Sequence, residues 1–308
     1  MKSNILILFC CFLFLASCQA PSIEEYTLLP HPVDIKYIPG MVKLKTQPTL
    51  VYPGELANEA LLLQCYLSSD FSVQATLKKN KKKGDIILQL DPAVLPEQAE
   101  GYILDATSGN IVLKANSPAG ILNAIQTFRQ VLKVKDGRLI VQKSTLTDYP
   151  VFSWRAFMLD EGRYFKGKEV VFDLLDEMAA LKMNVFHWHL TDDQGWRIEI
   201  KKYPKLTEIG AWRDSSEIDH FGSNRYDGRR HGGFYTQEEI KEVVDYAAKR
   251  NITVIPEIEM PGHASAAIAA YPWLGTSGKQ IKVPGKFGVQ YDIFNVADPR
   301  VIHFLNDV

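Results

Sequence analysis

The chain has 308 residues, of which 46% are hydrophobic, so it can bury a sizeable core as one large domain or as two unequal ones. Its 35 basic and 36 acidic side chains give a net charge of −1. This balance argues against general attraction to nucleic acid or to an anionic membrane surface, and no nucleic-acid partner is expected.

The first twenty residues, MKSNILILFCCFLFLASCQA, have the pattern of a signal peptide. Lys2 precedes an apolar run, Ile5 to Ala16, that is too short for a membrane-spanning helix. The run leads into Leu-Ala-Ser-Cys, which resembles the lipobox of bacterial lipoproteins. We therefore expect residues 1–18 to form a lipoprotein signal, Cys18 to carry lipid chains, and the protein to be anchored in the bacterial cell envelope, facing the periplasm or the surface. The alternative is an ordinary cleavage site that contains a cysteine.

The cysteine count does not support a disulfide framework. Cleavage of the signal would remove Cys10 and Cys11, and Cys65 would then be the only thiol besides an acylated Cys18. Cys65 lies in the apolar segment LLLQCYLSS, and we expect it to be a small core residue.

Residues 22–148 are expected to form a small α+β domain. Four segments alternate or run apolar over strand lengths: 33–38, 85–90, 101–107 and 110–115. Apolar residues recur at helical spacing from 119 to 134, which predicts a helix after the last of these strands. The pattern favours helices packed on an antiparallel sheet. The lysine-rich run Thr76 to Asp85 lies between two strand-like segments and predicts a solvated hairpin turn.

Residues 151–308 alternate strands and helices. Strand-like segments at 152–160, 184–190 and 252–260 are separated by a helical pattern at 168–182 and by a helix that starts at the capping box Thr236-x-x-Glu239. A last helix should begin with Asp298 as its cap and Pro299 as its first residue. This order is typical of a parallel α/β fold.

The fold class that this order favours is a (β/α)8 TIM barrel, because no Gly-rich phosphate-binding segment follows the first strand. A complete barrel takes typically about 250 residues. Only about half of this chain follows Pro150, and only three strands are predicted there. We therefore expect an incomplete barrel with about the first three βα units, in a sequence that looks truncated.

Each of the three predicted barrel strands ends in a polar cluster. These clusters are LDEGR at 159–163, TDDQGW at 191–196 and PEIEMPGH at 256–263. Carboxyl ends of barrel strands meet on one rim, where TIM-barrel enzymes place their active sites. The couplets Asp160-Glu161 and Asp192-Asp193 suggest paired carboxylates for glycoside hydrolysis, although neighbouring strand residues point to opposite faces.

His187 and His189 share one face of the second strand, and carboxylates are nearby in the sequence. Such a pair is compatible with a zinc-dependent hydrolase. The simpler interpretation is that neighbouring polar groups bind the ring nitrogens and that no metal is needed, because H-x-H is a short pattern with many chance matches.

Three long motifs resemble the β-N-acetylhexosaminidases of glycoside hydrolase family 20: MLDEGRYF, NVFHWHLTDDQGWRIEIKKYPKLTEIGAWR and VIPEIEMPGHA. The preceding segment EGYILDATSGNIVLKANSPAGILNAIQTFRQVL resembles the small N-terminal domain of that family. The resemblance implies a hydrolase of terminal non-reducing β-linked N-acetylglucosamine or N-acetylgalactosamine residues in glycans. The resemblance also implies that the enzyme retains the configuration at the anomeric carbon, uses the 2-acetamido oxygen of the substrate as nucleophile, and needs no cofactor.

By the same resemblance, Arg163 holds hydroxyls of the terminal sugar, and Asp192 and His263 support the catalytic groups. Glu259, at a position where many members have Asp, is also expected to support the active site. The acid/base pair of the family is an Asp-Glu in a motif of the type H-x-G-G-D-E after the fourth strand, and the 308 residues do not contain this motif. We therefore expect the chain alone to be inactive and the full-length gene product to be active. The alternative is a non-catalytic sugar-binding lipoprotein.

Overall fold

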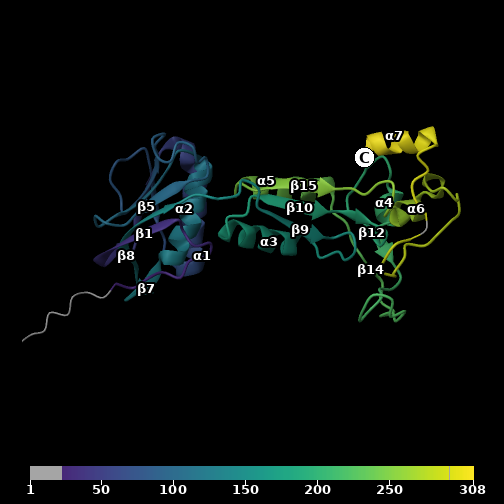
Figure 1. Cartoon of the computed structure of the whole chain (residues 1–308), viewed down its shortest axis with the longest axis horizontal. Helices are drawn as coiled ribbons and strands as arrows, with labels where there is room; N and C mark the ends of the chain where they lie inside the picture. Colours follow the sequence, from purple (N-terminus) through teal and green to yellow (C-terminus); the bar gives the residue numbers. More distant parts are fainter. Residues whose placement is uncertain (1–22, 291) are drawn as a thin grey trace, which may run out of the picture.

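The computed structural model describes residues 23–290 and 292–308. The predicted signal segment and Cys18 lie outside the described residues. Within the described ranges, none of the helices combines the length and the apolar character that crossing a membrane requires. Figure 1 shows a sheet with helices beside it at the N-terminal side, a smaller sheet in the middle, and short helices and loops at the far end.

One 8-stranded sheet occupies the first half of the chain. Its strands are β1 (Asp34–Lys43), β2 (Thr49–Tyr52), β3 (Thr76–Lys79), β4 (Ile86–Leu90), β5 (Tyr102–Asp105), β6 (Ile111–Ala115), β7 (Lys133–Lys135) and β8 (Arg138–Asp148). The strand order is β1-β8-β5-β6-β4-β2-β3, and β7 pairs with β8. The 3-10 helix η1 (Gly54–Leu56) leads into helix α1 (Ala57–Phe71), and helix α2 (Pro118–Val131) follows β6. Both α-helices lie between this sheet and the second half of the chain (Figure 1).

Helix α2 begins where its sequence indicates. The Ser117 side chain accepts a hydrogen bond from the backbone N–H of Gly120, and Pro118 stands at the first helical position. Ile121, Ile125 and Phe128 follow at helical spacing and are fully buried against the sheet. The sequence thus specifies both the start of the helix and the face that it buries.

Three predictions about this region are wrong. The sheet is mixed: β2 pairs in parallel with β3 and β4, and β4 pairs in parallel with β6, because α1 connects β2 to β3 as a crossover. The lysine-rich run is exposed, as predicted, but it is not a hairpin turn, since β3 and β4 flank β2 and run in the same direction. Cys65 is exposed rather than buried, because the buried face of α1 passes through Leu63 and Leu67.

Strands β9 (Ala156–Asp160), β10 (Val185–His189) and β15 (Thr253–Glu257) form a parallel sheet in the order β15-β10-β9. Helices α3 (Lys168–Ala180) and α5 (Gln237–Ala248) pack on it through a core that includes Leu175, Phe186, Trp188 and Val243. The predicted order of strand, helix, strand, helix, strand is confirmed. Three parallel strands joined by two helices are the arrangement expected for the beginning of a TIM barrel.

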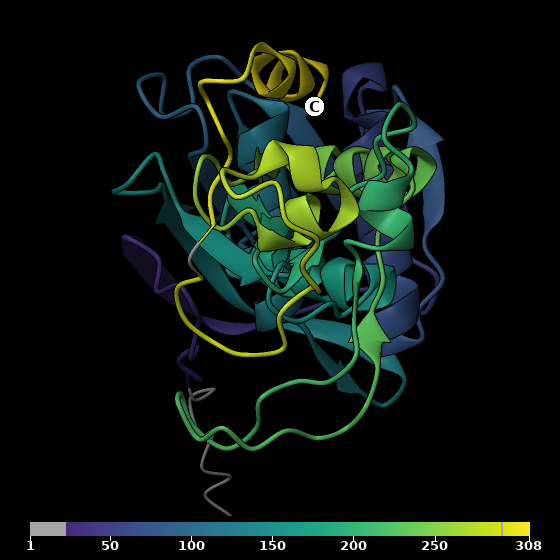
Figure 2. The ribbon, with the colours of Figure 1, turned by 90° about the vertical axis from the view of Figure 1, so that its right-hand side faces the viewer.

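The remaining elements lie beyond the carboxyl ends of these strands (Figures 1 and 2). They are β11 (Thr191–Asp192), β12 (Gly195–Trp196), α4 (Lys205–Glu208), β13 (Trp212–Arg213), β14 (His231–Gly232), α6 (Ser265–Ala270), the 3-10 helix η2 (Pro272–Leu274) and α7 (Pro299–Asp307). As predicted, Asp298 caps α7 and Pro299 is its first residue. A separate apolar core around Trp196, Ile268 and Phe304 holds this end together.

The opposite, amino ends of the parallel strands contact the N-terminal sheet. Arg155, just before β9, forms an ion pair with Glu100, and the Asn184 side chain donates a hydrogen bond of 3.0 Å to the same carboxylate. The ammonium of Lys182 donates hydrogen bonds of 2.8 Å to Asp148 and to the Tyr102 hydroxyl. The carboxyl ends of the strands therefore point away from the N-terminal sheet.

Candidate active site

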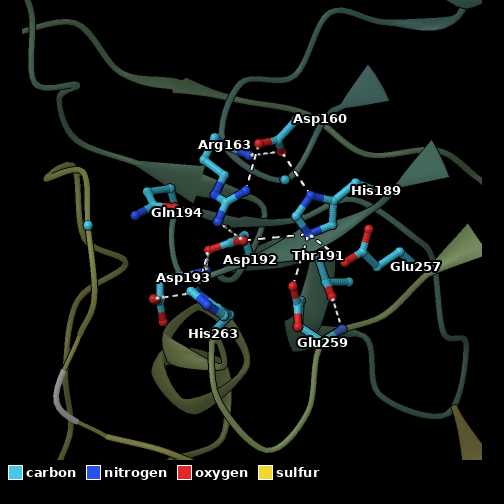
Figure 3. A network of polar contacts seen from close by, with 12 residues as sticks. Asp160, Arg163, His189, Thr191, Asp192, Asp193, Gln194, Glu257, Glu259 and His263 are labelled. Carbon is cyan, nitrogen blue, oxygen red and sulfur yellow. Dashed lines mark hydrogen bonds and ion pairs between the residues drawn. The ribbon is translucent and has the colours of Figure 1, made fainter. Parts of the chain in front are cut away.

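Arg163 lies at the carboxyl end of β9, where the chain turns back on itself. The Asp160 carboxylate accepts a hydrogen bond of 3.0 Å from the Arg163 backbone N–H, which fixes this turn. The guanidinium then contacts two carboxylates at 2.8 Å, Asp160 through Nη1 and Asp192 through Nη2 (Figure 3). Burial lowers the pKa of Arg163, but the two carboxylates outweigh this effect, so the net pKa is raised and the group stays charged.

Asp192 joins the loops that follow the first and third strands. Its side chain is only 1% exposed, and its two oxygens have different partners. Oδ2 contacts Arg163, while Oδ1 lies 3.2 Å from Nδ1 of His263 and accepts a hydrogen bond of 2.6 Å from the Asp193 backbone N–H. Burial raises the pKa of Asp192, and the Asp193 N–H, Arg163 and His263 oppose that rise.

The loop that carries His263 is fastened to the same place. Asp193 accepts hydrogen bonds from the backbone N–H and the hydroxyl of Ser265, at 3.0 and 2.6 Å. Its other carboxylate oxygen lies 3.3 Å from Nδ1 of His263. The His263 backbone has a φ of 50°, an uncommon conformation for a residue with a side chain. These contacts hold the imidazole beside Asp192.

His189, the last residue of β10, lies among four carboxylates (Figure 3). Nδ1 is 3.3 Å from Asp160, and Nε2 is 3.5 Å from both Asp192 and Glu259 and 3.8 Å from Glu257. The register of the sheet causes this, because His189 pairs with Asp160 on one side and with Glu257 on the other. Glu259 is held at the rim by a hydrogen bond of 2.9 Å from its backbone N–H to the Thr191 hydroxyl.

This arrangement suits a neutral ligand with several hydroxyl groups. Arg163 uses one N–H of each terminal nitrogen on Asp160 and Asp192, and 37% of its side chain is exposed. A guanidinium has five N–H groups in a planar fork, so Arg163 still has donors for two adjacent oxygens. The surrounding carboxylates can accept hydrogen bonds from hydroxyl groups. Donors and acceptors placed side by side are what sugar recognition requires.

Among the residues that the structure describes, two groups of side chains bring potential metal ligands within 4.8 Å of one another: His189 with Glu257 and Glu259, and Asp192 with Asp193 and His263. His187 belongs to neither group. Both histidines of the H-x-H pair contact the Glu257 carboxylate, His187 at 2.6 Å and His189 at 3.8 Å. In the second group, Arg163 already provides a positive charge beside Asp192.

Comparison with known families decides the identity of the fold. The family model for the catalytic domain of glycosyl hydrolase family 20 matches residues 152–308, and the model for domain 2 of that family matches residues 25–149. This chain belongs to glycoside hydrolase family 20.

Curated relatives agree with this assignment. A β-hexosaminidase from Porphyromonas gingivalis is 37% identical over 317 residues, which include 97% of this chain and 39% of the relative. A β-hexosaminidase from Vibrio furnissii is 45% identical over 220 residues, 70% of this chain and 34% of the relative. The chain thus spans between a third and two fifths of the length of these two relatives.

Solved family 20 structures have the same fold. The β-N-acetylhexosaminidase from Bacteroides fragilis superposes with a TM-score of 0.75 at 35% identity, over 91% of this chain and 53% of that protein. An exo-β-N-acetylglucosaminidase from Vibrio harveyi, solved with N-acetylglucosamine, gives a TM-score of 0.78 at 31% identity, over 94% of this chain and 46% of that protein. The predicted fold class, a small α+β domain followed by the start of a TIM barrel, is confirmed.

The structure brings the residues that the family 20 motifs indicated into one network. Arg163 and His263 contact the same carboxylate, that of Asp192, and Glu259 lies beside His189. Sequence reasoning missed two participants, the central position of His189 and the fully buried Arg197. The central position of His189 follows from the register of the three parallel strands, which a single sequence does not reveal. A lone arginine in the segment GWRIEI gave no signal either.

Proposed function

We propose that the whole protein is a β-N-acetylhexosaminidase that removes terminal non-reducing N-acetylglucosamine or N-acetylgalactosamine residues from glycans. The observation that carries the proposal is the half-exposed Arg163 fork, held between Asp160 and Asp192 at the carboxyl ends of barrel strands in a family 20 chain. The similarity to β-hexosaminidases, at 37% and 45% identity, supports it.

In the proposed mechanism the substrate provides its own nucleophile. The carbonyl oxygen of the 2-acetamido group attacks C1 of the sugar as the bond to the leaving oxygen breaks and that oxygen receives a proton. Water then opens the cyclic intermediate at C1, so the product retains its configuration. Such an intramolecular attack is fast only when the sugar is held in the reactive geometry. Arg163 would grip the sugar hydroxyls for this purpose.

Asp192 and His263 would support the catalytic groups. The network gives them suitable positions, because Asp192 bridges Arg163 and His263. The acid/base pair of the family, an Asp-Glu in a segment of the type H-x-G-G-D-E, does not occur in the 308 residues. We therefore propose that these residues bind and orient the sugar, and that residues 19–308 alone do not hydrolyse it.

The test uses the full-length gene product and an aryl N-acetyl-β-glucosaminide. We expect hydrolysis with retention, and no turnover of the matching aryl β-glucoside, which lacks the acetamido group. Residues 19–308, assayed in parallel, should release no aryl alcohol. Equal rates on the two substrates would contradict the substrate-assisted mechanism. Binding of N-acetylglucosamine without hydrolysis would instead favour the non-catalytic sugar-binding lipoprotein.

The zinc-dependent alternative has its own outcome in this assay. Stoichiometric zinc in the purified full-length protein, together with loss of hydrolysis after chelation, would support it. The proposal predicts that a chelator leaves the rate unchanged, because Arg163 supplies the positive charge at Asp192.

We also propose that the protein is anchored in the bacterial cell envelope by lipid on Cys18. The basic Lys2, the apolar run and the Leu-Ala-Ser-Cys segment support this proposal. Labelling with palmitate in a bacterial host tests it, with Cys65→Ser as the matched control because Cys65 is an exposed thiol. The label should persist in Cys65→Ser and disappear in Cys18→Ser. Label retained in Cys18→Ser would refute the anchor.

A further inference from the structure

Arg197 follows β12 and is fully buried. All five N–H groups of its guanidinium point at backbone carbonyls. Nε donates to Glu161 at 2.9 Å, Nη2 to Gly162 at 3.0 Å and to Gln194 at 3.3 Å, and Nη1 to Ala211 at 2.6 Å and to Gly233 at 3.2 Å. An arginine has five such groups, so its donors are fully used.

The positive charge of Arg197 is retained at a cost. Burial and the nearby Arg213 lower its pKa, Glu161 and Asp160 act in the opposite direction, and the net pKa is about 9. Carbonyl dipoles, and not a carboxylate in direct contact, surround the fork. A buried polar group that needs five partners restricts the backbone that provides them.

Three of the five carbonyls belong to the segments that carry Arg163 and Asp192, and the other two, those of Ala211 and Gly233, lie beside β13 and β14. Glu161 and Gly162 immediately precede Arg163, and Gln194 comes directly after Asp192 and Asp193. Arg197 therefore links the backbone that carries Arg163 to the backbone that carries its partner Asp192. The two loops also touch directly, since a Cβ on Gly162 would lie 2.9 Å from the Cβ of Asp192.

The local sequence leaves room for this link. A Cβ on Gly195 would lie 2.0 Å from Nη2 of Arg197 and 2.1 Å from its Cζ, so only glycine lets the guanidinium reach the five carbonyls. The Gly195 backbone pairs with Asp192 in the two-residue ladder of β11 and β12. The turn that presents Asp192 is thus also the turn through which Arg197 passes.

We propose that Arg197 is a positioning residue for sugar binding: it holds the loops after β9 and β10 at the separation at which Arg163 and Asp192 together present the guanidinium fork to the sugar. This inference rests on the proposed function. Arg197 does not touch the sugar, and it acts through Arg163. A lysine in its place keeps the charge but offers three donors on one atom, which cannot reach five carbonyls spread around a plane.

The test is steady-state kinetics of the full-length protein with an aryl N-acetyl-β-glucosaminide, for wild type, Arg197→Lys and Gly195→Ala. Loss of position at a binding fork weakens the grip on the sugar, so KM should rise by about tenfold or more in both variants. KM does not depend on how much of a sample is folded, so partial misfolding does not obscure the result. An unchanged KM in both variants would overturn the inference.

Arg155→Lys is the matched control. Arg155 is partly buried and, like Arg197, donates to backbone carbonyls, those of Phe152 and Lys182, but it lies at the amino end of β9 and also pairs with Glu100. Replacement of an arginine with a structural role alone should lower the melting temperature and leave KM at the wild-type value. An equal rise of KM in Arg155→Lys would show that general loosening, and not positioning of Arg163, causes the effect.

A double-mutant cycle separates action through Arg163 from an independent effect. If Arg197 works through Arg163, the change in KM caused by Arg197→Lys should largely disappear in an Arg163→Ala background. If the change in KM of the double variant equalled the product of the changes in the two single variants, the inference would be contradicted. Failure of the proposed function is distinguishable, because the wild-type protein would then not hydrolyse the substrate at all.

Discussion

At the amino ends of the parallel strands, Lys182, Asp148 and Tyr102 form a closed set of hydrogen bonds of 2.8 to 2.9 Å. At the carboxyl ends the single guanidinium of Arg163 and the imidazole of His189 face more carboxylates than they can match, several at 3.3 to 3.8 Å. The first cluster joins two parts of the fold, and the second leaves hydrogen-bonding capacity for a ligand. Incompletely satisfied buried charges therefore distinguish the end of the sheet that can bind a ligand from the end that joins two parts of the fold.

The largest expected effect at the carboxyl end comes from Arg163→Ala. Loss of charge-assisted hydrogen bonds to the sugar should lower kcat/KM of the full-length protein by about 10³-fold, which corresponds to about 4 kcal/mol. The kcat/KM of Arg163→Lys should lie between those of wild type and Arg163→Ala, because lysine keeps the charge but lacks the planar fork. Kinetics with an aryl N-acetyl-β-glucosaminide measure this. If kcat/KM of Arg163→Ala stayed within about threefold of the wild-type value, the carboxyl end would not have the functional role that distinguishes it from the amino end.

The largest effect at the amino end should fall on stability. Lys182→Met leaves the Asp148 carboxylate buried without its cation, and we expect a loss of about 3 kcal/mol in the free energy of unfolding. KM should not change, because Lys182 lies at the end of the sheet away from the sugar. Denaturant unfolding gives the first quantity and kinetics the second.

The control for that prediction replaces both partners. Lys182→Met combined with Asp148→Asn removes the uncompensated charge and should recover much of the lost stability. If KM rose in Lys182→Met as much as in Arg163→Ala, the amino and carboxyl ends of the sheet would not differ in function.

A smaller effect is expected at the start of α5, which lies near the carboxyl ends but outside the network. The Thr236 hydroxyl accepts from the Glu239 backbone N–H, and the Glu239 carboxylate accepts from the Thr236 backbone N–H. Thr236→Ala should cost about 1 kcal/mol of unfolding free energy, and Thr236→Ser much less. Chemical unfolding of both variants checks this. If Thr236→Ala changed KM but not stability, residues outside the network at this end of the sheet would also affect function, and the comparison would fail.

The smallest effect concerns the pH dependence of stability. Burial raises the pKa of Glu161 above its ordinary value of 4.5, so the charged form destabilises the folded state relative to the unfolded chain. This cost is absent well below pH 4.5 and grows as the pH rises through the folded pKa. Glu161→Gln keeps an acceptor for the Lys166 backbone N–H and should be the more stable form at pH 7.

Melting temperatures of wild type and Glu161→Gln between pH 4 and pH 8 test this sign. The advantage of glutamine should increase with pH. A constant difference, or a glutamine variant that is less stable at pH 8 only, would contradict the assignment of a buried, pKa-raised carboxylate.

Much of the fold was predictable because local signals and the strand–helix order agree. The capping box at Thr236, the Asp298-Pro299 helix start and the apolar stripe of α3 all occur where the sequence indicated them. The mixed sheet was not predictable from alternation alone, since a strand has the same pattern whether its neighbour is parallel or antiparallel. Cys65 was misassigned because the apolar run around it does not reveal which face of α1 is buried.

At the site, the family motifs indicated Arg163, Asp192 and His263, and the strand ends explain why they meet. The position of His189 among carboxylates depends on strand register, which a single sequence does not reveal. The role of Arg197 depends on five backbone carbonyls, which lie up to 36 residues from Arg197 on either side of it in the sequence. Backbone carbonyls leave no trace in residue identity, so only the three-dimensional structure could show that contact.

The most direct test of the central claim is a crystal structure of the full-length protein with N-acetylglucosamine. The sugar should lie at the carboxyl ends of β9, β10 and β15, with two of its hydroxyl oxygens within about 3 Å of the Arg163 guanidinium. A well-ordered sugar bound elsewhere, with Arg163 still directed only at Asp160 and Asp192, would contradict the account.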